Sequence, residues 1–134
     1  MWNLDDENIY TKFYSFTINE AFTYGNMTEG QRDKDKRERI REAANNNFPN
    51  DRPENKKWAF RITFGKSGGR QFDVENVPKL IIDAFCIKQI SNDNSVFTSL
   101  GLYKDDTIDE VIMVQVAGKR NNESYMEIEI FHKK

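Results

Sequence analysis

Four stretches of the chain alternate apolar and polar side chains, which is the pattern of β-strands with one buried face. The stretches are residues 9–18, 58–64, 107–117 and 125–132. The expected apolar faces are Tyr10, Tyr14, Phe16 and Ile18 in the first strand, Trp58, Phe60, Ile62 and Phe64 in the second, Ile108, Ile112, Val114 and Val116 in the third, and Met126, Ile128 and Ile130 in the fourth. We expect the last two strands to form a hairpin through residues 118–123.

Two further segments have the signals of helices. Residues 28–31 match a capping box, which predicts a helix from there to about Asn47. Its apolar positions are few and its charges alternate in sign, so we expect a surface helix with local ion pairs. A second helix is predicted from near Asn76 to about Ile90, with Pro78 in its first turn, where a missing N–H is tolerated.

This order of strand, helix, strand, helix, strand and strand predicts an α/β domain of the α+β type with a small mixed sheet. The length of 134 residues favours a single domain over residues 1–134. No apolar run approaches the roughly 18 residues of a membrane span, and the acidic N-terminus is unlike a secretory signal, so we expect a cytoplasmic protein without a membrane partner. One cysteine and one histidine exclude an internal disulfide and histidine-rich metal sites.

The formal net charge is only −2, but the charges are unevenly distributed. Residues 52–70 are mostly basic, and residues 73–110 are mostly acidic. The candidate phosphate contacts in the basic stretch are Lys56, Lys57, Arg61, Lys66 and Arg70. Two interpretations remain open: a metal-dependent site beside a phosphate-binding surface, or two ordinary solvated faces.

Two acidic clusters lie at the ends of predicted elements. Asp73 and Glu75 precede the second helix, and Asp105 and Asp106 precede the third strand. If the clusters meet, their oxygens suit a hard cation such as Mg²⁺, which can activate a water near a phosphodiester. Lys79, about one helical turn beyond the first cluster, would add a positive charge for the transition state. Taken singly, however, these residues are also typical of turns and helix caps.

The order and spacing of these residues resemble a known family. The chain reads Asp73-x-Glu75-Asn76-x-x-Lys79-x-x-x-Asp83-Ala84-Phe85, followed by Leu102-Tyr103-Lys104-Asp105-Asp106-Thr107. This pattern is similar to that of the RusA family of Holliday-junction resolvases, D-x-D-N-x-x-K-x-x-x-D-A/S-L and then a leucine, an aromatic residue, a variable residue and D-D-S/T. The resemblance covers roughly residues 72–116.

The resemblance implies a homodimeric, Mg²⁺-dependent endonuclease that makes paired cuts in four-way DNA junctions, with Mn²⁺ as a substitute ion. It implies catalytic roles for Asp73, Glu75, Lys79 and Asp106. The implied metal ligands are Asp73, Glu75, Asp106 and the supporting Asp105. Asn76 and Asp83 would orient these groups.

Two departures from the family pattern keep alternatives open. Glu75 stands where the family has a second Asp, and its side chain is one methylene longer. The connection from Asp83 to Gly101 is also longer than usual, with an extra segment at about residues 87–99. Either change would suit a non-catalytic module that binds branched DNA on the same fold. In a third hypothesis the acidic loops are incidental, and the protein binds neither metal nor DNA.

Overall fold

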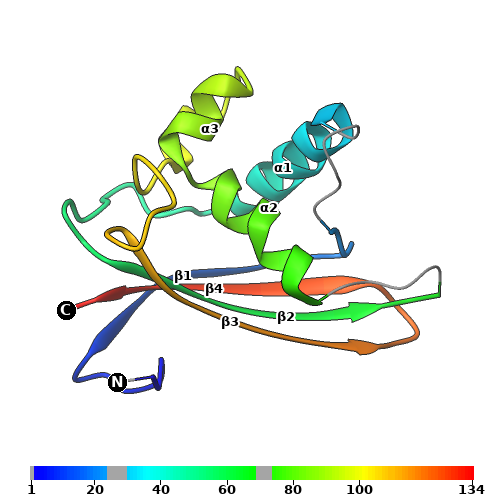
Figure 1. Ribbon diagram of the computed structural model, residues 1–134, viewed down its shortest axis with the longest axis horizontal. Helices are drawn as coiled ribbons and strands as arrows, with labels where there is room; N and C mark the ends of the chain where they lie inside the picture. Colours follow the sequence, from blue (N-terminus) through cyan, green and yellow to red (C-terminus); the bar gives the residue numbers. More distant parts are fainter. Residues whose placement is uncertain (1, 24–29, 69–73) are drawn as a thin grey trace.

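The computed structural model describes residues 2–23, 30–68 and 74–134. Three helices lie on one face of a four-stranded sheet, and the N-terminal segment lies on the other (Figure 1). The elements are β1 Tyr10–Ile18, α1 Gly30–Ala44, β2 Trp58–Lys66, the 3₁₀ turn η2 Val74–Asn76, α2 Val77–Ala84, α3 Ile87–Asn92, the 3₁₀ turn η3 Thr98–Leu100, β3 Val111–Arg120 and β4 Tyr125–Lys133. The predicted α+β class and mixed sheet are confirmed. None of the helices in these described ranges has the length and apolar content needed to cross a bilayer.

The strand order is β1-β4-β2-β3, so the expected hairpin between β3 and β4 is wrong. β2 lies between them, antiparallel to β4 and parallel to β3. The physical reason is burial: β2 is largely buried on both faces and takes a central place, whereas β3 ends in four exposed residues. Charged, exposed residues suit an edge strand, because they discourage further strand pairing.

Irregular pairing changes two of the predicted apolar faces. β1 shifts register between Lys12 and Tyr14, and Tyr10 therefore packs on the opposite face from Ile18. A similar register shift between β2 and β3 places Ile112 on the same face of the sheet as Tyr10. A single extra residue reverses which side chains point to the core, and period-two alternation cannot reveal this. Ile108 lies before β3 and is exposed.

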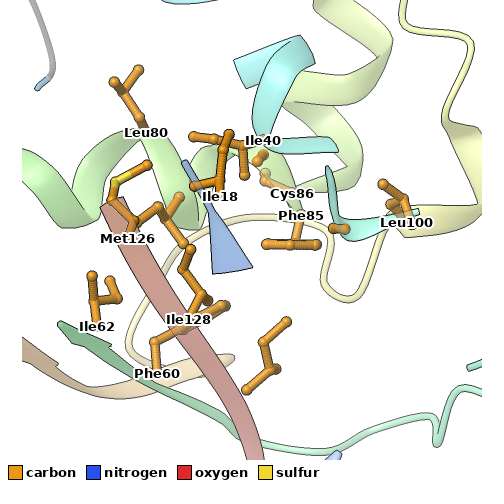
Figure 2. Packing of buried hydrophobic residues seen from close by; sticks show 14 of the residues in the cluster. Ile18, Ile40, Phe60, Ile62, Leu80, Phe85, Cys86, Leu100, Met126 and Ile128 are labelled. Carbon is orange, nitrogen blue, oxygen red and sulfur yellow. The ribbon is translucent and has the colours of Figure 1, made fainter. Parts of the chain in front are cut away.

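The main core fills the space between the helices and the sheet. The predicted face of β2, from Trp58 to Phe64, is buried there as expected. Figure 2 shows Ile40 and Leu80 from the helices near Ile128 and Met126 from β4. A smaller cluster on the other face joins Leu4, Tyr10, Ala59, Met113 and Phe131.

The predicted helix over residues 76–90 is divided into α2 and α3. Phe85 ends α2, and Cys86 is extended and pairs with Tyr103 in an isolated parallel bridge. Phe85 is fully buried and contacts the rings of Phe48 and Phe60. Burial of this ring and pairing of Cys86 together account for the interruption, which apolar spacing alone does not indicate.

α1 also differs from the prediction, because three of its charged residues are buried: Asp33, Arg37 and Arg41. Arg37 binds Asp93 with two hydrogen bonds of 2.7 and 2.8 Å, and Arg41 binds the same carboxylate at 2.9 Å. Arg41 also donates to the carbonyl of Ala84 at the end of α2. We call Arg37, Arg41 and Asp93 the buried network. It ties α1 to α2 and to the residue that follows α3. The expected local pairs are present as well, between Lys36 and Asp33 and between Arg41 and Glu38, so the prediction is wrong only in placing these charges on the surface.

Candidate active site

α2 carries the central basic residue of the predicted motif. Its apolar residues Val77, Leu80, Ile81 and Ala84 are buried against the sheet. This packing leaves Lys79 exposed and places Asp83 at the border, buried but one helical turn from Lys79. The helix thus presents an ammonium group and a carboxylate along one side.

The second acidic segment is attached to the region where α2 ends. Leu102 donates to the carbonyl of Phe85 at 2.8 Å, and Ile87 donates to that of Tyr103 at 2.8 Å. The Tyr103 hydroxyl reaches the carbonyl of Ile82 at 2.5 Å. These bonds fix the loop that leads to Asp106 beside α2.

The carboxylate of Glu110 closes this loop from the other side. Its two oxygens accept the backbone N–H groups of Lys104, at 3.2 Å, and Asp105, at 3.0 Å. Asp105 in turn accepts the N–H of Asp106 at 2.9 Å. The backbone at Asp106 is therefore held by the carboxylates of Glu110 and Asp105, and the side chain of Asp106 takes no part in holding the loop.

Lys79, Asp83 and Asp106 form one group, which we call the acid–lysine cluster. The Nζ atom of Lys79 lies 3.3 Å from Oδ1 of Asp83 and 3.3 Å from Oδ2 of Asp106. The second contact joins residues 27 positions apart. The structure therefore brings the two halves of the motif together at a single ammonium group.

Electrostatics distinguishes the two carboxylates of the cluster. Burial raises the pKa of Asp83 above its ordinary value, and the attraction of Lys79 only partly offsets this. Burial also tends to raise the pKa of Asp106. The charge of Lys79 and the hydrogen bond with Asp105 outweigh burial, so the pKa of Asp106 lies below its ordinary value. Burial opposes the charge on Lys79, yet both carboxylates outweigh it and raise the pKa of the ammonium group. Lys79 is therefore protonated and Asp106 ionised at neutral pH.

The other predicted site residues are less closely assembled. Glu75 lies exposed on η2, and Asn76 begins α2 without a side-chain capping bond. The Oδ2 atom of Asp105 lies 4.0 Å from the Nζ atom of Lys88. Asp73 falls outside the described residues. Within the described ranges, no three acidic, histidine or cysteine side chains come together as a metal site.

The predicted phosphate contacts do not form one surface. Lys56 and Lys57 precede β2, while Lys66 ends it, so Lys57 and Lys66 lie roughly 30 Å apart at the usual rise per strand residue. Arg61 alternates with the core residues of β2, and its side chain binds Asp5 and Glu129. Those carboxylates raise its pKa and already neutralise its charge. Arg70 lies outside the described residues.

Sequence reasoning missed two basic residues near the start of the site. Lys119 and Arg120 end β3 and line a cavity of about 180 Å³ together with Lys66 and Val74. Both residues fall in the expected turn over residues 118–123, so the sequence contains no signal that they end a strand. Their place beside Lys66 depends on the parallel pairing of β3 with β2, which the expected hairpin did not indicate.

Comparison with models of protein families and with curated proteins gives no match to this chain. The resemblance to the RusA family therefore rests on the sequence motif alone.

Proposed function

We propose that this protein is a Mg²⁺-dependent endodeoxyribonuclease that cuts branched DNA, with the four-way junction as its substrate. The observation that carries the proposal is the contact of Lys79 with both Asp83 and Asp106. The three residues are those that the resolvase-like motif assigns to one site. Metal-assisted phosphodiester hydrolysis uses carboxylates that hold the ion and a fixed positive charge that stabilises the transition state, and the cluster supplies carboxylates from two distant parts of the chain beside such a charge.

The chemistry of the donors fits a hard divalent ion. Carboxylate oxygens are its preferred ligands, and Asp106 is ionised and partly exposed. Asp73, Glu75 and Asp106 would hold the ion, with Asp105 in support. When bound, Mg²⁺ supplies Lewis-acid activation of water and neutralises charge on the phosphodiester.

The remaining steps belong to the side chains. Lys79 places a permanent positive charge beside the phosphate and stabilises the oxygen that gains charge as the bond breaks. Asp83 is a positioning residue: it is buried and holds the ammonium group 3.3 Å away. A junction with two-fold symmetry is cut in pairs by a two-fold dimer, and we therefore propose a homodimer with one site in each subunit.

The substitution Asp106→Asn tests the proposal. We expect it to abolish Mg²⁺-dependent nicking of a labelled four-way junction and to leave junction binding unchanged, because the fold of the loop depends on backbone contacts. Asp109→Asn is the matched control, an exposed acid in the same connection that should nick normally. Undiminished nicking by the Asp106→Asn protein would contradict the assigned role.

Lys79→Ala separates transition-state stabilisation from simple phosphate binding. We expect the rate of nicking to fall much more than the affinity for the junction, since the ammonium group acts on developing charge. Measurement of both quantities on the same junction decides the point. A loss of affinity as large as the loss of rate would make Lys79 a phosphate clamp.

A non-catalytic module that binds branched DNA is the second candidate. It is favoured by the exposed position of Glu75 and by the lack of a three-ligand group within the described ranges. This candidate predicts salt-dependent junction binding without nicking in either Mg²⁺ or Mn²⁺. Nicking by the wild-type protein that Asp106→Asn abolishes would exclude it.

A further inference from the structure

Glu110 lies directly before β3 and joins the loop of the candidate site to the sheet. The backbone N–H of Trp58, the first residue of β2, donates to the Glu110 carbonyl at 2.7 Å. Trp58 is buried in the main core, so this contact starts from a fixed point of the fold. Glu110 also donates its own N–H to the carbonyl of Thr107 at 3.0 Å. The backbone of Glu110 is therefore held by β2 on one side and by the turn after Asp106 on the other.

The half-buried side chain of Glu110 binds two backbone groups that come earlier in the loop. Its oxygens accept the N–H groups of Lys104, at 3.2 Å, and Asp105, at 3.0 Å. A carboxylate accepts at both oxygens, whereas the amide of glutamine offers one oxygen and an NH₂ group that can only donate. An ionised acceptor also forms a stronger hydrogen bond than a neutral one. An acidic side chain is thus the one that suits these two donors.

The contacts that begin at Glu110 continue to the acid–lysine cluster. Glu110 accepts the N–H of Asp105, and Oδ1 of Asp105 accepts the N–H of Asp106 at 2.9 Å. Oδ2 of Asp106 lies 3.3 Å from the Nζ atom of Lys79. Because the side chain of Asp106 takes no part in holding the loop, the conformation of the loop backbone decides where this carboxylate lies.

We infer that Glu110 is a positioning residue for the proposed reaction: it holds the loop so that the Asp106 carboxylate stays beside Lys79, where it would meet the cation. This inference rests on the proposed function and adds a residue outside the resolvase-like motif, which ends at Thr107. Groups that orient metal ligands without binding the metal typically change metal affinity or activity about 10–100-fold when they are replaced.

Two substitutions of Glu110 test this inference through the metal dependence of nicking. Glu110→Ala removes both acceptors, and Glu110→Gln keeps one. We expect the Mg²⁺ concentration for half-maximal nicking of a four-way junction to rise about 10–100-fold in Glu110→Ala and by a smaller factor in Glu110→Gln. The KM for the junction should not change, because Glu110 acts on the metal ligand and not on the DNA. A role in stability alone would lower the amount of folded protein and would leave the Mg²⁺ dependence as it is.

Glu38→Ala is the matched control. Glu38 is also half-buried, and its carboxylate binds Arg41 at 2.6 Å within α1. We expect this variant to lose stability in urea and to keep the Mg²⁺ dependence of the wild type. If the wild type nicks the junction and Glu110→Ala has the same Mg²⁺ dependence as Glu38→Ala, Glu110 is only structural and the inference is overturned.

Amide hydrogen exchange provides an arm that needs neither DNA nor metal. We expect the amides of Lys104 and Asp105 to exchange at least about tenfold faster in Glu110→Ala than in the wild type, because they lose their acceptor. Glu38→Ala should leave both amides unchanged. If exchange follows this expectation but the wild type does not nick, Glu110 still holds the loop and the proposed function fails. If both amides exchange equally fast in Glu110→Ala and the wild type, Glu110 does not hold the loop and the inference is overturned.

Discussion

Two groups of charged residues lie near α2, and they differ in how many hydrogen bonds each carboxylate receives. In the buried network, the carboxylate of Asp93 accepts hydrogen bonds from Arg37, Arg41 and Gln89. In the acid–lysine cluster, one ammonium group that is 46% exposed serves two carboxylates at 3.3 Å each. The buried network joins helices. In the acid–lysine cluster, two carboxylates share one ammonium group, and we propose that one of them, Asp106, also binds a cation.

The difference leads to a prediction about where folding stability and the proposed nicking activity depend on charge. A buried charge with all its hydrogen bonds made is costly to disturb, because its partners are left without solvent. Charges at the edge of solvent contribute little to folding. The buried network should therefore dominate stability and the acid–lysine cluster should dominate catalysis.

Arg41→Met should have the largest effect on folding. Arg41 is fully buried, and its removal leaves Asp93 with one arginine and the Ala84 carbonyl without its donor. We expect the free energy of unfolding to fall by about 3–5 kcal/mol, measured with urea. Arg39→Met is the control: its ion pair with Glu20 is exposed, and the loss should be about 0–1 kcal/mol. Equal losses would show that burial does not separate the two groups.

Asp93→Asn should cost about 2 kcal/mol at pH 7, because it weakens hydrogen bonds to two buried arginines. Burial acts to raise the pKa of Asp93, but Arg37, Gln89 and Arg41 prevail and lower it. Its stabilisation is therefore present above the ordinary value of 3.8 and is lost as pH falls below it. Urea unfolding at several pH values should show the variant and the wild type converging in acid. A difference that persists at low pH would exclude ionisation of Asp93 as the cause.

Asp83→Asn should behave in the opposite way. The pKa of Asp83 is raised by burial, so its ionisation reduces stability as pH rises from 3.8 towards the raised value. We expect the variant to lack that decline and to remain within about 1 kcal/mol of the wild type at pH 7. The same urea series measures it, and nicking should slow because Lys79 loses its partner. A loss of stability as large as that of Asp93→Asn would remove the contrast between the groups.

Lys79→Met should have the smallest effect on folding, about 0–1 kcal/mol, because the ammonium group is half exposed. The matched variant Lys88→Met removes an exposed lysine 4.0 Å from Asp105 and should resemble it in stability. Nicking should separate the two, with only Lys79→Met inactive. Equal activity of the two variants would place the catalytic cation elsewhere.

The strands and the class of fold follow from alternation, but strand pairing does not. Trp58 and Phe64 mark a buried face that the structure confirms. β2 lies between β4 and β3 because both of its faces are largely buried. The alternation of side chains within β3 and β4 does not indicate which strand lies between them. Arg37 and Arg41 have the spacing of surface residues, and their partner Asp93 lies more than 50 positions away.

The candidate site was also predictable only where it depends on local spacing. Lys79 and Asp83 are one turn apart on a helix, which local spacing is sufficient to indicate. Asp106 joins them through backbone bonds between the segments at Phe85 and Leu102. Its place in an acidic cluster before a predicted strand made it a candidate, but no local spacing indicates that it meets Lys79. Lys119 required knowledge of the parallel pairing.

The parallel pairing of β2 and β3 has a consequence for how the protein folds. Parallel neighbours cannot be joined by a tight turn, and here the intervening chain holds α2, α3 and the loop that carries Asp106. Closing so long a connection is a slow event that depends on distant contacts. The edge strand and the acid–lysine cluster should thus form in the same step of refolding, and nicking activity should recover no earlier than β3 becomes protected from hydrogen exchange.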